Sequence, residues 1–294
     1  MHTTLISATE LKALQAAGAP LMVFDCSFDL MNPASGEEQY RSAHIPGAVY
    51  AHLDHALSDM GLPDASGVYQ PHADAASGGR HPLPSREKFA IWLSSVGFSN
   101  AMQAVVYDRN NANYCGRLWW MLKWAGHEAV AVLDGGLQAW QAEGGEVSTG
   151  TEASHFQSNF EIGSPLRRLV TTREVAQGLG GDQALIDARA GARHRGEVEP
   201  LDPVAGHIPG ALNRPSPENL GPDGRFKPAA QLRAEFDALL AGRNPAHVVH
   251  HCGSGVSALP NLIAMEVAGF APTGLYAGSW SEWCRDKSLP VEKG

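Results

Sequence analysis

The feature that most constrains the fold is an internal repeat, because the chain contains two copies of one pattern. Residues 105–109 (VVYDR) align without a gap with residues 248–252 (VVHHC). Upstream of each segment stands the motif His-Ile-Pro-Gly-Ala, which begins at His44 in the first copy and at His207 in the second. A repeat of this length is a duplicated domain, since solenoid units are much shorter. We therefore expect two domains of the same fold.

The pattern within each copy predicts an α/β domain. Short apolar runs rich in Val, Ile and Leu alternate with amphipathic segments of helical period, which is typical of a mainly parallel sheet with flanking helices. Buried strands are predicted at residues 21–24, 104–107, 129–133, 184–186 and 247–249, and helices at 117–124 and 229–240. The chain has 294 residues, enough for two cores. We expect domains at residues 1–147 and 166–294, with a polar linker at 148–165.

Composition narrows the possible partners. The formal net charge of -9 argues against nucleic acid. Residues 1–150 hold 8 Lys+Arg against 15 Asp+Glu, whereas residues 151–294 hold 14 against 16, so a site for small anions is expected in the second half. No apolar run is long enough to cross a membrane, and the first residues do not resemble a signal peptide. Four cysteines without metal-ligand spacing indicate a reducing compartment, and we expect a cytoplasmic protein without a cofactor.

One cysteine stands in a position suited to chemistry. Cys252 follows the apolar run 246–249 and precedes a helical pattern at 259–268. Its thiol is therefore expected at a helix N-terminus, where unpaired N–H groups and the helix dipole favour a thiolate and can hold an anion bound to the sulfur. A structural cysteine in a tight turn is the alternative. The glycines and hydroxyls around Cys252 favour a nucleophile.

The segment Cys252 to Ala258 (CGSGVSA) resembles the active-site loop of the tandem-domain rhodanese and 3-mercaptopyruvate sulfurtransferase family, with Ser257 in place of the usual Thr. A cysteine phosphatase loop would need Arg at the position of Ala258. The resemblance covers nearly the whole chain and implies two tandem rhodanese-like domains, each a mainly parallel sheet flanked by helices. In the alignment Arg109 takes the place of Cys252, so the first copy lacks the nucleophile, as in the family.

The resemblance implies sulfur transfer through a persulfide on Cys252. Negative charge then develops on sulfur, and the loop N–H groups would stabilise it as an oxyanion hole does. The residues expected to contact the donor through their backbone are Gly253, Gly255, Val256 and Ala258. The hydroxyls of Ser254 and Ser257 are expected to donate to the outer sulfur, to cap the helix, or both.

The neutral pair Gly253-Ser254 favours mercaptopyruvate as the small anionic donor, because thiosulfate-preferring members typically carry Arg-Lys there. The acceptor is left open among thioredoxin, glutathione, a sulfur carrier protein and cyanide. Two alternatives remain: a thiosulfate:cyanide sulfurtransferase, and a noncatalytic tandem rhodanese-like module that binds partners or carries sulfur.

Proton transfer to the departing enolate would need a relay behind Ser254. His44 is the expected relay histidine, because the mercaptopyruvate branch is thought to use this motif in a Ser-His-Asp relay. His207, in the second copy of the motif, shows that such a histidine can instead be structural. The segment 32–38 offers no convincing match to the family's relay Asp.

Arginines of the second half are expected to bind the donor. The run 187–193 is similar to the family's Asp-Ser/Ala-Arg-x-x-x-Arg, so Arg193 is the expected carboxylate clamp, and Arg189 a second candidate or an ion pair with Asp187. Arg80 and His81 lie in a Gly-rich loop that could approach a cleft between the domains. No metal is expected, since the neighbouring His250 and His251 would point to opposite faces of a strand.

Overall fold

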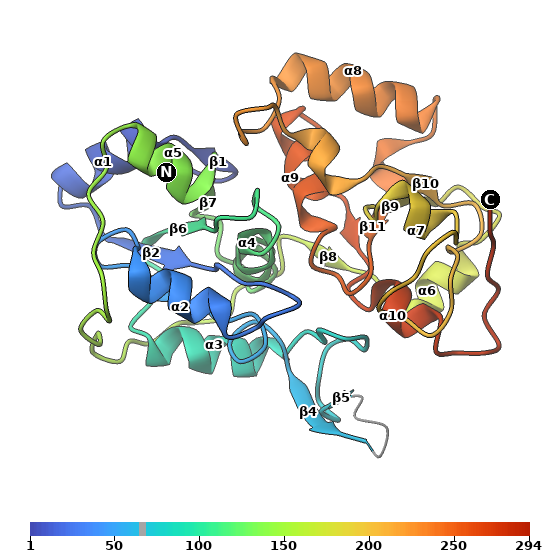
Figure 1. Ribbon diagram of the computed structural model, residues 1–294, viewed down its shortest axis with the longest axis horizontal. Helices are drawn as coiled ribbons and strands as arrows, with labels where there is room; N and C mark the ends of the chain where they lie inside the picture. The colour runs from blue at the N-terminus through green and yellow to red at the C-terminus, as the bar shows by residue number, and fades with distance from the viewer. Residues whose placement is uncertain (65–68) are drawn as a thin grey trace. The chain divides into compact units, whose positions relative to one another are not determined.

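The computed structural model describes residues 1–64 and 69–294 (Figure 1). The chain forms two compact units, which are described separately. Unit 1 comprises Met1–Ser58, Pro84–Leu166 and Pro222–Phe226; unit 2 comprises Asp59–Leu83, Arg167–Gly221 and Lys227–Gly294. These units differ from the expected boundaries, because residues 59–83 pack with the second unit and residues 222–226 with the first.

Each unit is built on a parallel five-stranded sheet, as predicted. The order in unit 1 is β1-β7-β6-β2-β3, and in unit 2 it is β8-β12-β11-β9-β10 when read from the corresponding edge. The strands of unit 1 are β1 (Leu5–Ile6), β2 (Leu21–Asp25), β3 (Val49–Tyr50), β6 (Gln103–Tyr107) and β7 (Val130–Leu133). Those of unit 2 are β8 (Arg168–Leu169), β9 (Ala184–Asp187), β10 (Leu212–Asn213), β11 (Val248–His251) and β12 (Gly274–Leu275). The duplication seen in the sequence therefore extends to strand order.

Helices pack against each sheet (Figure 1). In unit 1 they are α1 (Ala8–Ala16), α2 (Ser35–Ser42), α3 (Arg86–Ser95), α4 (Cys115–Trp124) and α5 (Gly136–Ala142). In unit 2 they are α6 (Thr172–Gln177), α7 (Gly191–His194), α8 (Ala229–Leu240), α9 (Leu259–Val267) and α10 (Ser279–Trp283), with 3-10 turns at Ser216–Asn219 and Pro245–His247. Unit 2 also holds the antiparallel pair β4 (Met60–Pro63) and β5 (Tyr69–Pro71). No described helix is long and apolar enough to cross a membrane.

The cores of the two units repeat each other. The central strands β6 and β11 are buried along their whole length, as expected for parallel strands covered on both faces. Ile45 and Trp140 belong to the core of unit 1, and Ile208 and Trp283, at the repeat-equivalent positions, belong to that of unit 2. The duplicated motifs thus supply equivalent core contacts.

The segment expected as a linker, residues 148–165, has no helix or strand but belongs to unit 1. Ser148 exchanges two backbone hydrogen bonds with His44, and the N–H of Phe160 donates to the Ser94 hydroxyl at 3.0 Å. These bonds replace the sheet or helix partners that the segment lacks. It therefore packs as part of the first unit.

Candidate active site

Cys252 lies directly after the central strand β11, and its backbone is held by α10. The Cys252 N–H donates to the Ser279 hydroxyl at 3.1 Å, while the Cys252 carbonyl accepts from the N–H of Trp280 at 3.0 Å. Ser279 has φ +55°, a left-handed conformation that a non-glycine residue adopts only when its surroundings impose it. The side chain of Cys252 is buried, and the cysteine is free. Strand and helix together fix where the thiol stands.

The loop from Cys252 to α9 presents a set of unpaired backbone donors. Among the described residues, no protein acceptor receives a hydrogen bond from the N–H groups of Gly253, Ser254, Val256, Ser257 and Ala258. Gly255 gives the loop its curvature with φ +74°, and a Cβ at that position would lie 2.2 Å from the Ala277 carbonyl oxygen. Unpaired N–H groups before a helix form an anion-binding concavity. Of the N–H groups that were expected to form the cradle, those named above are therefore free of protein acceptors in the described part of the chain.

Ser254 has a histidine partner, but it is not the predicted one. The Nδ1 atom of His81 lies 2.8 Å from the Ser254 hydroxyl, and both residues are buried. His81 belongs to the segment 59–83, which packs with unit 2 although it precedes much of unit 1 in the chain.

The contacts of α10 hold this segment in place. The Arg80 N–H donates to the Ser281 hydroxyl at 3.0 Å, and the Gly78 N–H donates to Glu282 at 3.1 Å. Gly79 has φ +87°, and a Cβ there would meet the Gly278 carbonyl oxygen at 2.6 Å. Only glycine fits this approach without displacing backbone. The Gly78-Gly79 pair was the sequence signal that this loop packs closely against another element.

His44 has the contacts of a structural residue. Its Nδ1 lies 2.7 Å from the Tyr40 carbonyl and its Nε2 3.0 Å from Glu152, and the imidazole stacks on the Tyr40 ring. The same glutamate accepts the N–H of Gly47 at 2.9 Å. Both ring nitrogens of His44 are thus engaged within unit 1.

His207 repeats these contacts in unit 2. Its Nδ1 lies 2.7 Å from the His194 carbonyl, its ring stacks on that of His194, and Glu292 accepts the N–H of Gly210. Because both copies use the motif in the same way, the motif fixes the turn in front of a strand. We therefore replace His44 by His81 as the relay candidate.

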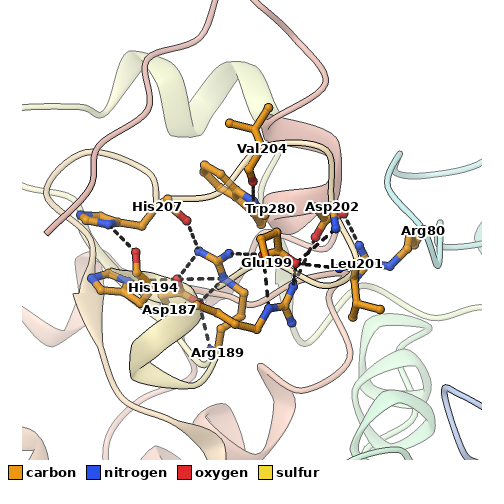
Figure 2. A network of polar contacts seen from close by, with 12 residues as sticks. Arg80, Asp187, Arg189, His194, Glu199, Leu201, Asp202, Val204, His207 and Trp280 are labelled. Atoms are coloured by element: carbon orange, nitrogen blue, oxygen red, sulfur yellow. Dashed lines mark hydrogen bonds and ion pairs between the residues drawn. The ribbon is translucent and has the colours of Figure 1, made fainter. Parts of the chain in front are cut away.

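Two guanidinium groups flank Gly253, the residue after Cys252. A Cβ on Gly253 would lie 3.0 Å from Nη2 of Arg80 and 3.6 Å from both terminal nitrogens of Arg193. Arg193 also forms an ion pair with Glu199 at 2.6 Å. Arg80 forms one with Asp202 (Figure 2). The expected clamp Arg193 is therefore beside the loop, and Arg80 joins it.

Arg189 is not placed to bind a donor. Its guanidinium is buried, pairs with Asp187 at 2.7 Å and donates to the Gly206 carbonyl at 2.7 Å (Figure 2). It also lies over the ring of Trp280, 4.8 Å from the centroid. Burial alone would raise the pKa of Asp187, but the nearby His251, His194 and Arg189 lower it below its ordinary value. We therefore withdraw Arg189 from the substrate-binding set and assign it the ion pair that was the alternative.

Trp280 and Trp283, the tryptophans of the C-terminal signature, are core residues. Both are fully buried, and the indole N–H groups donate to the carbonyls of Val204 and Pro290 at 2.8 Å. Buried indoles satisfied in this way stabilise α10, on which the backbone of Cys252 depends.

The repeat-equivalent loop in unit 1 is closed by its own side chains. Arg109, in the place of Cys252, pairs with Asp25 at 2.9 Å. The carboxylate of Asp108 accepts four backbone N–H groups of the loop at 2.8 to 3.0 Å, from Asn110, Ala112, Tyr114 and Cys115. Three of these donors, the N–H groups of Asn110, Tyr114 and Cys115, are repeat-equivalent to those of Gly253, Ser257 and Ala258, which stay unpaired among the described residues.

Comparison with known proteins identifies a family for this chain. The family model described as Rhodanese-like domain matches residues 7–143 and 171–286. A Pseudomonas aeruginosa protein named "Probable 3-mercaptopyruvate sulfurtransferase" is 43% identical over 293 residues, which cover 99% of this chain and 98% of that protein. The 3-mercaptopyruvate sulfurtransferase of Escherichia coli K12 is 34% identical, covering 87% and 85% of the two chains.

Solved structures show the same architecture. The 3-mercaptopyruvate sulfurtransferase from Leishmania major superposes with a TM-score of 0.80 at 26% identity, covering 98% of this chain and 76% of that one. The chain therefore belongs to the rhodanese family. It is a sulfurtransferase with two rhodanese-like domains.

Proposed function

We propose that the protein moves sulfane sulfur from 3-mercaptopyruvate, through a persulfide on Cys252, to a thiol such as thioredoxin or glutathione, or to cyanide. The observation that carries this proposal is the neutral cradle of unpaired N–H groups beside the buried thiol of Cys252. The similarity to proteins named 3-mercaptopyruvate sulfurtransferase in Pseudomonas and Escherichia coli supports the donor.

In the first half-reaction the Cys252 thiolate attacks the sulfur of mercaptopyruvate. A sulfur–sulfur bond forms, the carbon–sulfur bond breaks, and its electron pair leaves with the enolate of pyruvate. The enolate carbon then needs a proton. Ser254 can donate its hydroxyl proton and recover one from His81, whose Nδ1 is 2.8 Å away. The pair therefore supplies a relay without His44.

In the second half-reaction an acceptor thiolate or cyanide attacks the outer sulfur and releases the Cys252 thiolate. Negative charge rests on the persulfide between the two steps. The unpaired N–H groups of Gly253, Ser254, Val256, Ser257 and Ala258 stabilise it without reorganisation, because the backbone is already fixed by α10 and the Gly255 turn. The same donors serve both stages.

The guanidinium groups of Arg193 and Arg80 are the proposed holders of the donor carboxylate. A planar guanidinium can bind a carboxylate through two parallel hydrogen bonds. Nη1 of Arg193 and Nη2 of Arg80, both near Gly253, are outside the ion pairs with Glu199 and Asp202. They leave donors for one carboxylate beside the reacting sulfur.

Thiosulfate is the second candidate donor. The two guanidiniums near Gly253 favour an anion of either kind, and the mouse protein named thiosulfate sulfurtransferase is 30% identical, covering 91% of this chain and 86% of that one. Steady-state rates with both donors separate the candidates. A kcat/KM for mercaptopyruvate at least about tenfold above that for thiosulfate supports the proposal. Equal or reversed values favour a thiosulfate sulfurtransferase, and turnover with neither donor favours a noncatalytic sulfur-carrying or binding module.

A further inference from the structure

One buried carboxylate joins the two arginines that flank Gly253. The Asp202 side chain, 1% exposed, contacts Nη1 of Arg80 through one oxygen (Figure 2). Its other oxygen contacts Nη2 of Arg193 at 3.4 Å. Its N–H donates to Glu199 at 3.2 Å, which fixes the backbone of this residue. Asp202 therefore holds the two guanidiniums in one arrangement.

The network around these residues is balanced in charge. Three guanidiniums, those of Arg80, Arg189 and Arg193, meet three carboxylates, those of Asp187, Glu199 and Asp202. Nε of Arg80 is buried and has no hydrogen-bond partner within the described ranges, so this guanidinium keeps donor capacity beyond its ion pair. The cluster can bind an anion. The negative charge of Asp202, however, cancels one of the positive charges that would attract a second negative charge on that anion.

We propose that Asp202 determines donor choice by setting the charge of the arginine pair. This inference rests on the proposed function of the Cys252 site. Mercaptopyruvate brings one carboxylate to the guanidiniums, whereas thiosulfate is a dianion that must place both charges near them. A carboxylate fixed between Arg80 and Arg193 repels the thiosulfate dianion more strongly than the single carboxylate of mercaptopyruvate. It therefore favours mercaptopyruvate by disfavouring thiosulfate. The selector is thus a residue 50 positions before the nucleophile, in addition to the Gly253-Ser254 pair.

The test is the ratio of kcat/KM for mercaptopyruvate to that for thiosulfate, measured on one preparation of each full-length variant. Asp202→Asn keeps the shape and removes the charge, and we expect the ratio to fall at least about tenfold, with most of the change in KM for thiosulfate. Arg80→Gln makes the opposite change in charge and should raise the ratio. Asp202→Glu restores the carboxylate and should return the ratio to within about threefold of the wild type.

Glu266→Gln is the matched control, because Glu266 is another little-exposed carboxylate of unit 2 that pairs with an arginine, Arg167. It should leave the ratio unchanged. A general loss of folding lowers both kcat/KM values by the same factor, so it does not by itself change their ratio. If Asp202→Asn does not fold, Arg80→Gln still tests the inference. An unchanged ratio in soluble Asp202→Asn, or shifts of the same sign in the Asp202 and Arg80 variants, overturns the inference. A wild type that turns over neither donor defeats the proposed function instead.

Discussion

Nδ1 of His81 lies 2.8 Å from the hydroxyl of Ser254, although the two residues are 173 positions apart in the chain. The contact joins a segment from the first half of the sequence to the loop of the nucleophile in the second. It brings together the two residues of the proposed proton relay.

The nucleophile is tested by replacing each cysteine with serine. Cys252→Ser should abolish turnover, because in the described part of the chain this thiol stands directly before a loop of unpaired N–H groups. Cys26→Ser, Cys115→Ser and Cys284→Ser should keep the chemistry, since burial, the largest influence on each, raises the pKa of these thiols above its ordinary value. Mass spectrometry after donor treatment should find added sulfur on the Cys252 peptide. Sulfur found only on another cysteine would contradict the assignment.

The relay is tested by comparing two histidines. His81→Asn should lower kcat by about 10²-fold, the usual contribution of one general acid–base group, and should change the pH profile of kcat. His44→Gln should instead lower the melting temperature, because it breaks the contacts with Tyr40 and Glu152, and should leave that profile in place. His207→Gln, which breaks the equivalent turn of unit 2, is the control for loss of stability. If His44→Gln alters the pH profile of kcat and His81→Asn does not, the relay histidine is His44, as expected from the sequence.

Two buried imidazoles predict a loss of stability in acid. Burial is the main cause that lowers the pKa of His250 to about 3 and that of His251 to about 4. In the unfolded chain both titrate near 6.5, so between about pH 6.5 and 4 the unfolded state binds more protons. The free energy of unfolding should therefore decrease as the pH is lowered through this window, by on the order of 1 kcal/mol per pH unit for each imidazole. Urea unfolding at pH 7 and pH 5 measures this, and His250→Leu should reduce the slope; an equal slope in that variant would disprove its role.

The closed loop of the first unit predicts a large effect from a single carboxylate. Asp108→Ala leaves four backbone N–H groups without their acceptor, and we expect it to lower the free energy of unfolding by about 2 to 4 kcal/mol. Asp134→Ala is the control, because Asp134 accepts one backbone N–H, that of Phe226 at 2.9 Å. Equal losses in the two variants would show that the four donors do not depend on Asp108.

Much of the fold could be predicted because its signals are local. The apolar runs gave the central strands, and the helix expected at 229–240 has the observed bounds, Ala229–Leu240. The position of Cys252 between a strand and a helix could also be predicted, since the apolar run before it and the helical pattern after it are local signals. The helix N-terminus and the cradle required only neighbouring residues.

The site partners could not be read in this way. His81 contacts Ser254 because it lies in a segment that belongs to the second compact unit. The hydrophobic periodicity of a sequence does not show which unit a segment packs with. His44 was favoured because its motif is conspicuous, but the same contacts at His207 show that the motif serves a turn. Arg189 and Arg193 belong to one motif but have different surroundings. Arg189 is buried against Asp187, whereas Arg193 lies beside Gly253. The spacing of the motif does not reveal this difference.

The exchange of segments between the two copies has an evolutionary consequence. A duplicated gene ordinarily leaves one copy free to decay or to be deleted, because the other still carries the activity. Here the copy with Arg109 in the place of Cys252 encodes Arg80 and His81, which lie with Cys252 in the other compact unit. Loss of the first half would remove the partner of Ser254 together with one of the two guanidiniums. We therefore expect the two halves to be inherited together, since a gene for the second half alone would lack both residues.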